Sequence, residues 1–136
     1  MEENNEAWLR QVNSELGGFG ELVGLRAEVV RQGYCRLSCD IQPKHCNPRG
    51  TVHGGMSATM LDTAGGVAAI FSGEAPRPVV TQSASAHYLR PLSGSKIIAE
   101  AQVVKAGHRT CLTRADLYDD QHRLCCTGEI ELFFID

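Results

Sequence analysis

The chain has 136 residues, enough for one domain with a sizeable core and too few for a second. Its hydrophobic content of 43% is ordinary for a globular protein, and a net charge of −3 gives no reason to expect a nucleic-acid surface. The first residues are acidic and polar, and no uninterrupted apolar span approaches about 18 residues. We therefore expect a cytoplasmic protein with no membrane segment.

Six cysteines raise the question of a disulfide scaffold or a metal site. No export signal is visible, and the cysteine spacings contain no paired C-x2-C motif of the kind that binds zinc. Free cysteine behaves as a small hydrophobic residue, so we expect reduced, mostly buried thiols and no bound metal.

The first half of the chain predicts a helix followed by a hairpin. Residues 3 to about 16 fit a short amphipathic helix that ends at Gly17-Gly18 and packs on the edge of the body. Residues 21–40 alternate apolar and polar side chains around Gln32-Gly33, which is typical of a β-hairpin.

The central stretch, residues 47–69, holds a polar loop and the start of the one long segment that predicts a buried helix. No proline interrupts it after Pro48, and small or apolar side chains recur every three or four residues. The apolar face comprises Met56, Met60, Ala64, Val67 and Ala68. A second face, free of bulky side chains, comprises Gly55, Ala58, Thr59, Asp62, Gly65 and Gly66.

Two groups in this stretch are candidates for chemistry. Asp62 is a carboxylate in an apolar, glycine-rich helix, where burial without a partner is costly, so we expect a functional acid, with a structural carboxylate as the alternative. Gly54 offers a backbone N–H at the helix start that can bind an oxyanion, although a glycine also suits a tight turn into a helix. The two lie roughly 12 Å apart along a helix axis. One acyl carbon cannot easily touch both, so we infer a site shared by two subunits.

Four further β segments follow a loop over residues 72–78. We expect them at about 79–90, 95–106, 109–119 and 122–134. Their short connections predict an antiparallel meander. Together with the hairpin and one helix, this gives an α+β fold in which about six antiparallel strands wrap around the central helix. We assign residues 1–20 to the N-terminal helix and linker and residues 21–136 to this domain.

Several motifs in the chain resemble those of the hotdog-fold acyl-CoA thioesterases, of the phenylacetate-pathway, PaaI-like type. They are Asn47, Gly50, His53-Gly54-Gly55, Asp62-Thr63, Thr81, Tyr88-Leu89-Arg90-Pro91, Gly107-His108-Arg109 and the final strand. The resemblance implies a single hotdog domain, a homodimer as the minimal active unit, and pairing of dimers into a homotetramer. It also implies hydrolysis of an acyl-CoA to the free acid and CoA, with no cofactor because CoA is part of the substrate.

The resemblance also implies roles for individual residues. Asp62 is then the catalytic carboxylate, either a general base for water or a nucleophile that forms an anhydride. Thr81 positions the attacking water, although a strand threonine is often only a β-former. Asn47, pushed to an extended conformation by Pro48, holds the acyl carbonyl or the water, with an ordinary Asn-Pro turn as the alternative. His53 either fixes the turn, which we favour, or takes part in proton transfer.

Arg90, His108 and Arg109 are candidates for contact with the phosphates of CoA. They lie at predicted strand ends, where guanidinium groups bind phosphate well, and a solvated charge is the plain alternative for each. Gly107 belongs to the same turn, which lines the nucleotide in the family that the chain resembles. The sequence does not decide whether the acyl group is an aryl group or a medium-chain, branched or hydroxylated one.

Two other functions stay open at this point. Asp40 and His45 echo the aspartate-histidine spacing of hotdog hydratases, so an enoyl-CoA hydratase or dehydratase is one alternative. A noncatalytic acyl-CoA-binding protein is the other, because fold does not fix function. A binding protein would not need Asp62, so the effect of Asp62→Asn on hydrolysis separates it from an enzyme.

Overall fold

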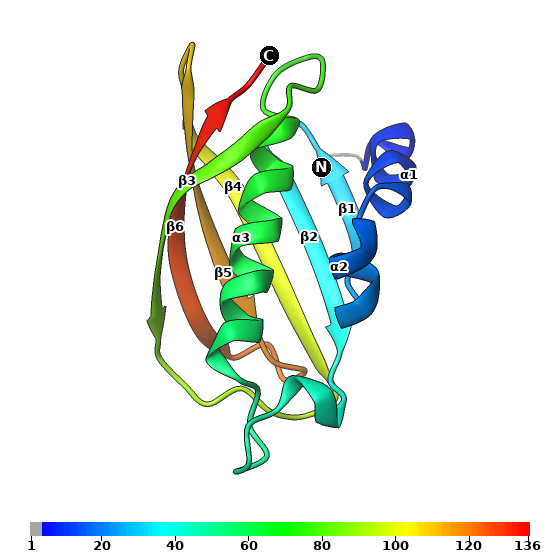
Figure 1. Ribbon diagram of the computed structural model, residues 1–136, viewed down its shortest axis with the longest axis vertical. Coiled ribbons are helices and arrows are strands. Elements are labelled where there is room, and N and C mark those ends of the chain that lie inside the picture. Colours follow the sequence, from blue (N-terminus) through cyan, green and yellow to red (C-terminus); the bar gives the residue numbers. More distant parts are fainter. Residues whose placement is uncertain (1–3) are drawn as a thin grey trace.

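The long central helix, α3, runs from Gly54 to Ile70 against one face of a six-stranded sheet (Figure 1). This computed structural model describes residues 4–136. All five side chains of the predicted apolar face are buried, which confirms the helix and its orientation. Gly65 was expected on the open face and is buried instead, because the helix touches the sheet there. A Cβ on Gly65 would lie 2.6 Å from the Thr113 hydroxyl oxygen.

The other elements follow the expected order. They are α1 (Glu6–Ser14), α2 (Gly17–Val23), β1 (Arg26–Arg31), β2 (Tyr34–Asp40), the short 3-10 helix η1 (Pro43–His45), β3 (Val79–Tyr88), β4 (Lys96–Ala106), β5 (Thr110–Tyr118) and β6 (Leu124–Phe134). The hairpin turn at Gln32-Gly33 is confirmed, and so are the four later strands, whose bounds differ from the prediction by a few residues at most. The predicted α+β architecture, a sheet wrapped around one central helix, is also confirmed.

The N-terminal region departs from the prediction. Helix α1 ends at Ser14, and Gly17-Gly18 also begin a second helix, α2. The expected strand start at Glu21 is wrong, because β1 begins only at Arg26. Positive φ values of 75° at Gly17 and 83° at Gly24 turn the chain at both ends of α2, so the apolar residues between them form a helix. Residue 3, the expected first residue of the first helix, lies outside the described residues.

The position of β3 is the main correction to the predicted topology. The strand order is β1-β2-β4-β5-β6-β3, with antiparallel neighbours, so β3 pairs with β6 at the far edge and only β4, β5 and β6 form a meander. The connection from β3 to β4 is no hairpin turn. Val52 N–H donates to the carbonyl of the buried Leu92 at 2.8 Å, which holds this connection below the start of α3 as it crosses to the middle of the sheet (Figure 1).

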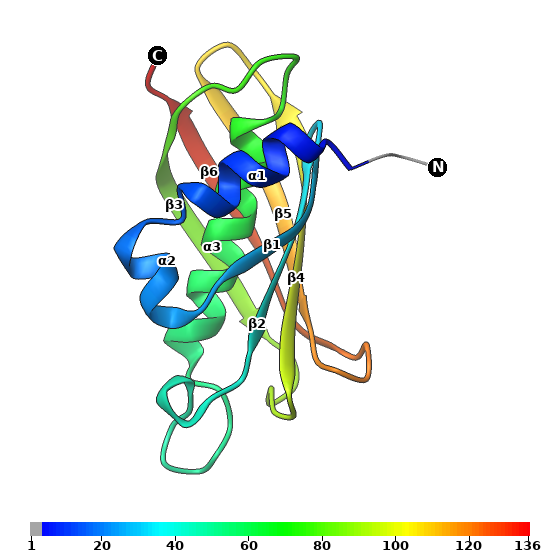
Figure 2. The ribbon, with the colours of Figure 1, turned by 90° about the vertical axis from the view of Figure 1, so that its right-hand side faces the viewer.

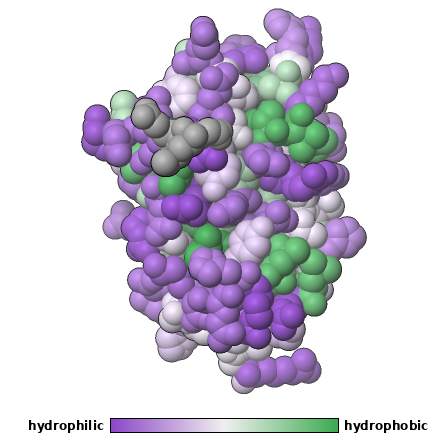
Figure 3. Space-filling view, turned by 180° about the vertical axis from the view of Figure 1, so that it is seen from behind, coloured by the Kyte–Doolittle hydropathy of each residue, from purple (hydrophilic) through white to green (hydrophobic). Residues whose placement is uncertain are grey.

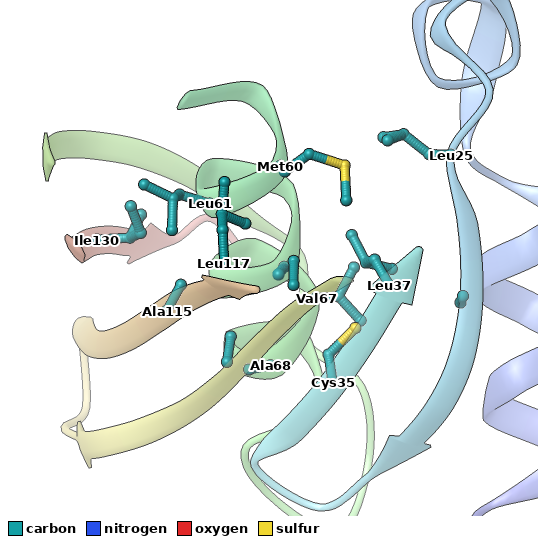
Figure 4. Close-up of a cluster of buried hydrophobic side chains, with 14 of the residues drawn as sticks. Leu25, Cys35, Leu37, Met60, Leu61, Val67, Ala68, Ala115, Leu117 and Ile130 are labelled. Carbon is teal, nitrogen blue, oxygen red and sulfur yellow. The ribbon is translucent and has the colours of Figure 1, made fainter. Parts of the chain in front are cut away.

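The core lies between α3 and the concave face of the sheet. Figure 4 shows Met60, Leu61 and Val67 of the helix facing Leu37 and Leu117 of the strands. All six cysteines are free thiols and five are buried, as expected. Within the described residues, no helix is long and apolar enough to cross a membrane.

The two faces of the sheet differ in character. The outer face is largely hydrophilic, with separate hydrophobic patches, as Figure 3 shows. Helices α1, α2 and α3 all lie on the opposite face (Figure 2). An antiparallel sheet with one packed and one solvated face has this pattern. The candidate site residues on α3 therefore lie on the helical side of the molecule.

Candidate active site at the start and middle of α3

The first turn of α3 is capped by His53. The backbone of His53 is extended (φ −61°, ψ 137°), and its Nδ1 accepts the Gly55 N–H at 2.8 Å. This contact places the proton of the neutral ring on Nε2 and fits the structural role that we favoured. The His53 carbonyl accepts the N–H groups of Met56 and Ser57, at 2.9 and 3.2 Å. Three of the first four N–H groups of α3 are therefore occupied.

Gly54 supplies the fourth of these groups. Its N–H has no acceptor among residues 4–136, so a helix N–H with partial positive charge is available to an external oxyanion. The local fold does not require a glycine here. The φ of Gly54 is not positive, and a Cβ would meet its nearest neighbour, the Tyr88 ring, at 3.6 Å, an ordinary contact. The absence of a side chain is instead consistent with close approach of a ligand.

Tyr88 is a neighbour of this site that the sequence analysis did not select. Its hydroxyl donates to the Gly54 carbonyl at 3.0 Å, and burial raises the pKa of the phenol, so the group stays protonated at neutral pH. The signal in the sequence was its place in the Tyr88-Leu89-Arg90-Pro91 motif. That motif gave the residue no role, because the pairing of β3 that brings it to α3 was not predicted.

Asp62 and Thr81 form a hydrogen-bonded pair within one chain. The Thr81 hydroxyl donates to Asp62 Oδ1 at 2.7 Å, and the carboxyl group is half-buried. A register shift between Thr81 and Ser83 leaves Gln82 as an extra residue of β3, and such bulges re-aim neighbouring side chains. Asp62 Oδ2 has no hydrogen-bond or ion-pair partner among the described residues. One carboxylate oxygen is thus fixed, and the other is free to accept a proton.

Asn47 is engaged by its own loop. Its side-chain oxygen accepts the Arg49 N–H at 2.9 Å, and its amide nitrogen donates to the Thr51 hydroxyl at 2.9 Å. Gly50, at φ 86°, closes the turn with an N–H bond to the Asn47 carbonyl. This is an Asx-type turn, the alternative that we considered for an Asn-Pro pair. One amide hydrogen of Asn47 is left for a ligand.

The candidate CoA-binding residues lie at opposite ends of the molecule. Arg90 is exposed beside Gly54, where both line a cavity of about 320 Å³. The turn with Gly107, His108 and Arg109 joins β4 to β5 at the other end, above the end of α3 in Figure 1. There the His108 carbonyl accepts a hydrogen bond from Arg77 at 3.0 Å. A single chain therefore does not bring the four residues together.

Two thiols also line the cavity beside Gly54, and neither fits a nucleophile. Burial raises the pKa of Cys126 to about 11, and it raises the pKa of Cys125 as well. A thiol nucleophile reacts as the thiolate, which needs a lowered pKa. The candidate that the resemblance indicated, Asp62 acting directly or through water, therefore does not compete with a thiol.

The aspartate and histidine that suggested a hydratase do not form a site. His45 is buried, its Nδ1 accepts the Gln42 N–H at 2.9 Å, and its Nε2 donates to the Val23 carbonyl at 2.7 Å. Both ring nitrogens are thus used to hold η1 against α2. Asp40 is exposed and makes no side-chain hydrogen bond to His45. This arrangement gives no acid-base pair for hydration.

Comparisons with known proteins identify the family and the fold. The sequence model of the thioesterase superfamily matches residues 49–126. The proofreading thioesterase EntH of Klebsiella pneumoniae is 32% identical over 98 residues, which cover 72% of each chain. Two solved structures share the fold. A thioesterase from Haemophilus influenzae superposes with a TM-score of 0.87 at 22% identity, covering 94% of this chain and 90% of its own. The PaaI protein of Escherichia coli superposes with a TM-score of 0.86 at 20% identity, covering 96% and 94%.

The family match spans the part of the chain that carries the helix start, Asp62 and Thr81. A half-buried carboxylate with a hydroxyl donor, and a free N–H at a helix start, are groups that a thioester hydrolase can use. The chain therefore belongs to the thioesterase superfamily, with a hotdog fold of the PaaI-like type, and is a thioester hydrolase.

Proposed function

We propose that the protein hydrolyses small aryl or medium-chain acyl-CoA thioesters at a site shared by two subunits. The observation that carries the proposal is the placement of two unsatisfied groups on one helix. The Gly54 N–H and Asp62 Oδ2 lack partners within the described chain and are separated by eight residues, roughly 12 Å along the axis of α3. One reacting carbon can meet both only if they come from different subunits.

The free edge of β3 supports this arrangement. β3 ends the sheet, and eight of its ten residues are exposed. An open strand edge is a template for pairing with another strand, and a second copy placed on it by a two-fold axis runs in the opposite direction. The start of α3 in one subunit then lies beside the middle of α3 in the other. Arg90 of one subunit also approaches the Gly107–Arg109 turn of the other, where both can meet CoA phosphates. Two such dimers would form the homotetramer, in the cytoplasm.

The reaction follows from the two groups. The Gly54 N–H stabilises the negative charge that develops on the thioester oxygen as the carbonyl carbon is attacked. Asp62, oriented by Thr81, takes a proton from the attacking water. The tetrahedral intermediate then collapses, the carbon–sulfur bond breaks, and CoA leaves as the thiol after protonation. In the alternative course Asp62 itself attacks the carbonyl carbon, the carbon–sulfur bond breaks as CoA leaves, and water then hydrolyses the resulting anhydride to the free acid and the Asp62 carboxylate.

The release of free thiol from acetyl-CoA, octanoyl-CoA and phenylacetyl-CoA distinguishes an enzyme from a noncatalytic acyl-CoA-binding protein. We expect Asp62→Asn to lower kcat by at least about 100-fold while CoA binding persists, as for loss of a general base. Thr81 offers a matched pair, because Thr81→Val removes the hydroxyl and keeps the shape, whereas Thr81→Ser keeps the hydroxyl. Thr81→Val should be the slower variant. Wild-type hydrolysis rates in Asp62→Asn would refute the assignment.

A further inference from the structure

Helix α1 is fastened to the edge strand β1. Asn13 pairs with Ala27 through two hydrogen bonds, from its amide nitrogen to the Ala27 carbonyl at 3.1 Å and from the Ala27 N–H to its side-chain oxygen at 2.8 Å. Near the start of α1, the Asn5 N–H donates to the Val30 carbonyl at 2.7 Å. These bonds hold both ends of α1 on β1, so the position of the helix is fixed.

A cavity of about 460 Å³ lies between α1 and α3. Figure 2 shows α1 crossing in front of α3. The apolar side chains lining the cavity include Val12 and Leu16 near the end of α1 and Val67, Ile70 and Phe71 at the end of α3. Trp8 and Phe71, with ring centroids 4.7 Å apart, bridge the two helices beside the cavity. Apolar walls that fail to meet lose packing energy, so a space kept open by rigid elements suits a ligand.

The cavity is reachable from the candidate catalytic carboxylate. Thr63, the residue after Asp62, lines the cavity. Gly66 lies four residues after Asp62 and three after Thr63, so it is a surface neighbour of both on the helix. A Cβ on Gly66 would meet only the end of Leu132 at 3.7 Å, an ordinary contact, so packing within the chain does not require a glycine there. The helix surface between Asp62 and the cavity therefore has no side chain at Gly66 to obstruct an acyl group.

We propose that this cavity is the acyl pocket of the enzyme and that Leu16, which lies between α1 and α2, limits which acyl groups fit. The inference rests on the thioesterase function proposed above. The lining of α3 from Thr63 to Phe71 spans roughly 12 Å, which suits an extended chain of medium length. The rim disfavours an anionic acyl group, because Glu15 carries a carboxylate and the cation Arg77 is already bonded to Asp136 at 2.7 Å. The apolar walls disfavour any charged group, because burial of an unpaired charge is costly. The occupant is a neutral, medium-chain aliphatic acyl group.

The test measures binding, so it does not depend on turnover. In the Asp62→Asn background, calorimetry compares the affinities of octanoyl-CoA and CoA, and the ratio isolates the contribution of the acyl chain. Leu16→Trp fills the cavity from the α1 side. Gln11→Trp does so from an exposed position at the rim, which protects the test against misfolding of the first variant. The matched control is Leu22→Trp on α2, where Leu22 is 67% exposed and lines a separate cavity near His53.

We expect the octanoyl group to strengthen binding, and Leu16→Trp to reduce the ratio of affinities by about tenfold or more, the scale of an excluded apolar group. Gln11→Trp should reduce it in the same direction, and Leu22→Trp should leave it within about twofold of the parent. An unchanged ratio in both Leu16→Trp and Gln11→Trp, or a loss confined to Leu22→Trp, would overturn the assignment of this cavity. Failure of the thioesterase function shows separately, as absence of thiol release by the wild-type protein from any acyl-CoA tested.

Discussion

Replacing Gly54 by proline removes one hydrogen-bond donor and should leave the fold of the helix start intact. Gly54 is the first residue of α3, a position where proline is favoured because the N–H has no intrahelical partner. The residue before a proline must be extended, and His53 already is, at φ −61° and ψ 137°. The nearest atoms to a new Cβ belong to the Tyr88 ring, at 3.6 Å. The helix should therefore form normally in Gly54→Pro.

The expected cost is that of one oxyanion donor. Loss of such a donor lowers kcat by about 100- to 1,000-fold, which corresponds to about 2.7–4 kcal/mol of transition-state stabilisation. Gly54→Ala is the matched control, because it adds the same Cβ and keeps the N–H. Its kcat should stay well above that of Gly54→Pro.

Steady-state thiol release measures both variants, and thermal unfolding verifies that they fold. A Gly54→Pro protein with the unfolding temperature of the wild type and the kcat of Gly54→Ala would refute the role of this N–H. Equal, large losses in both variants would show that space at Gly54 matters and the donor does not.

Three further predictions concern packing, the site and pH. Gly65→Ala should destabilise the protein by about 1–3 kcal/mol through overpacking against the sheet, whereas Gly66→Ala should stabilise it by up to about 1 kcal/mol through helix propensity. Urea unfolding at matched protein concentration measures both free energies of unfolding, and equal values for the two variants would contradict the close packing of Gly65 on the sheet. Tyr88→Phe removes the hydrogen bond to the first turn of α3 and should lower kcat by about tenfold or less without changing the unfolding temperature; unchanged kinetics would assign Tyr88 no part in the site. The bonded Arg77 lowers the pKa of Asp136 below its usual 3.8, so this pair stabilises the fold above that value and ceases to do so as the pH falls through the lowered pKa. Asp136→Asn should thus lower the unfolding temperature at neutral pH, and the gap to the wild type should close in acid; a constant gap would refute the linkage.

The sequence predicts the elements of this fold better than their arrangement. The periodicity of α3 and the turns around Gln32-Gly33 and Gly107 mark local structure, because glycine and apolar spacing act within a few residues. The partner of β3 depends on where the chain crosses after Pro91, which is decided by burial of Leu92 under α3. Helix α2 was missed because its short apolar run between glycines fits a strand equally well.

In the candidate site, too, local features could be predicted from the sequence and contacts between distant elements could not. The position of Asp62 on the helix and the exposed N–H of Gly54 follow from helical geometry. The hydrogen bond from Thr81 depends on a bulge in β3, and the contact of Tyr88 depends on which strand pairs with which. Both residues belong to motifs visible in the sequence, but the bulge and the strand pairing that create these contacts have no local signal there. The acyl pocket is less predictable still, because it arises from the docking of α1 on β1 through Asn13.

Activity in hybrid dimers tests the shared site most directly. One subunit carries Asp62→Asn and keeps its Gly54 N–H; the other carries Gly54→Pro and keeps its carboxylate. If each site combines Gly54 of one subunit with Asp62 of the other, a hybrid contains one intact site and should regain about half of the wild-type activity per dimer. Verified hybrids as inactive as the parent variants would contradict the account and confine each site to one chain.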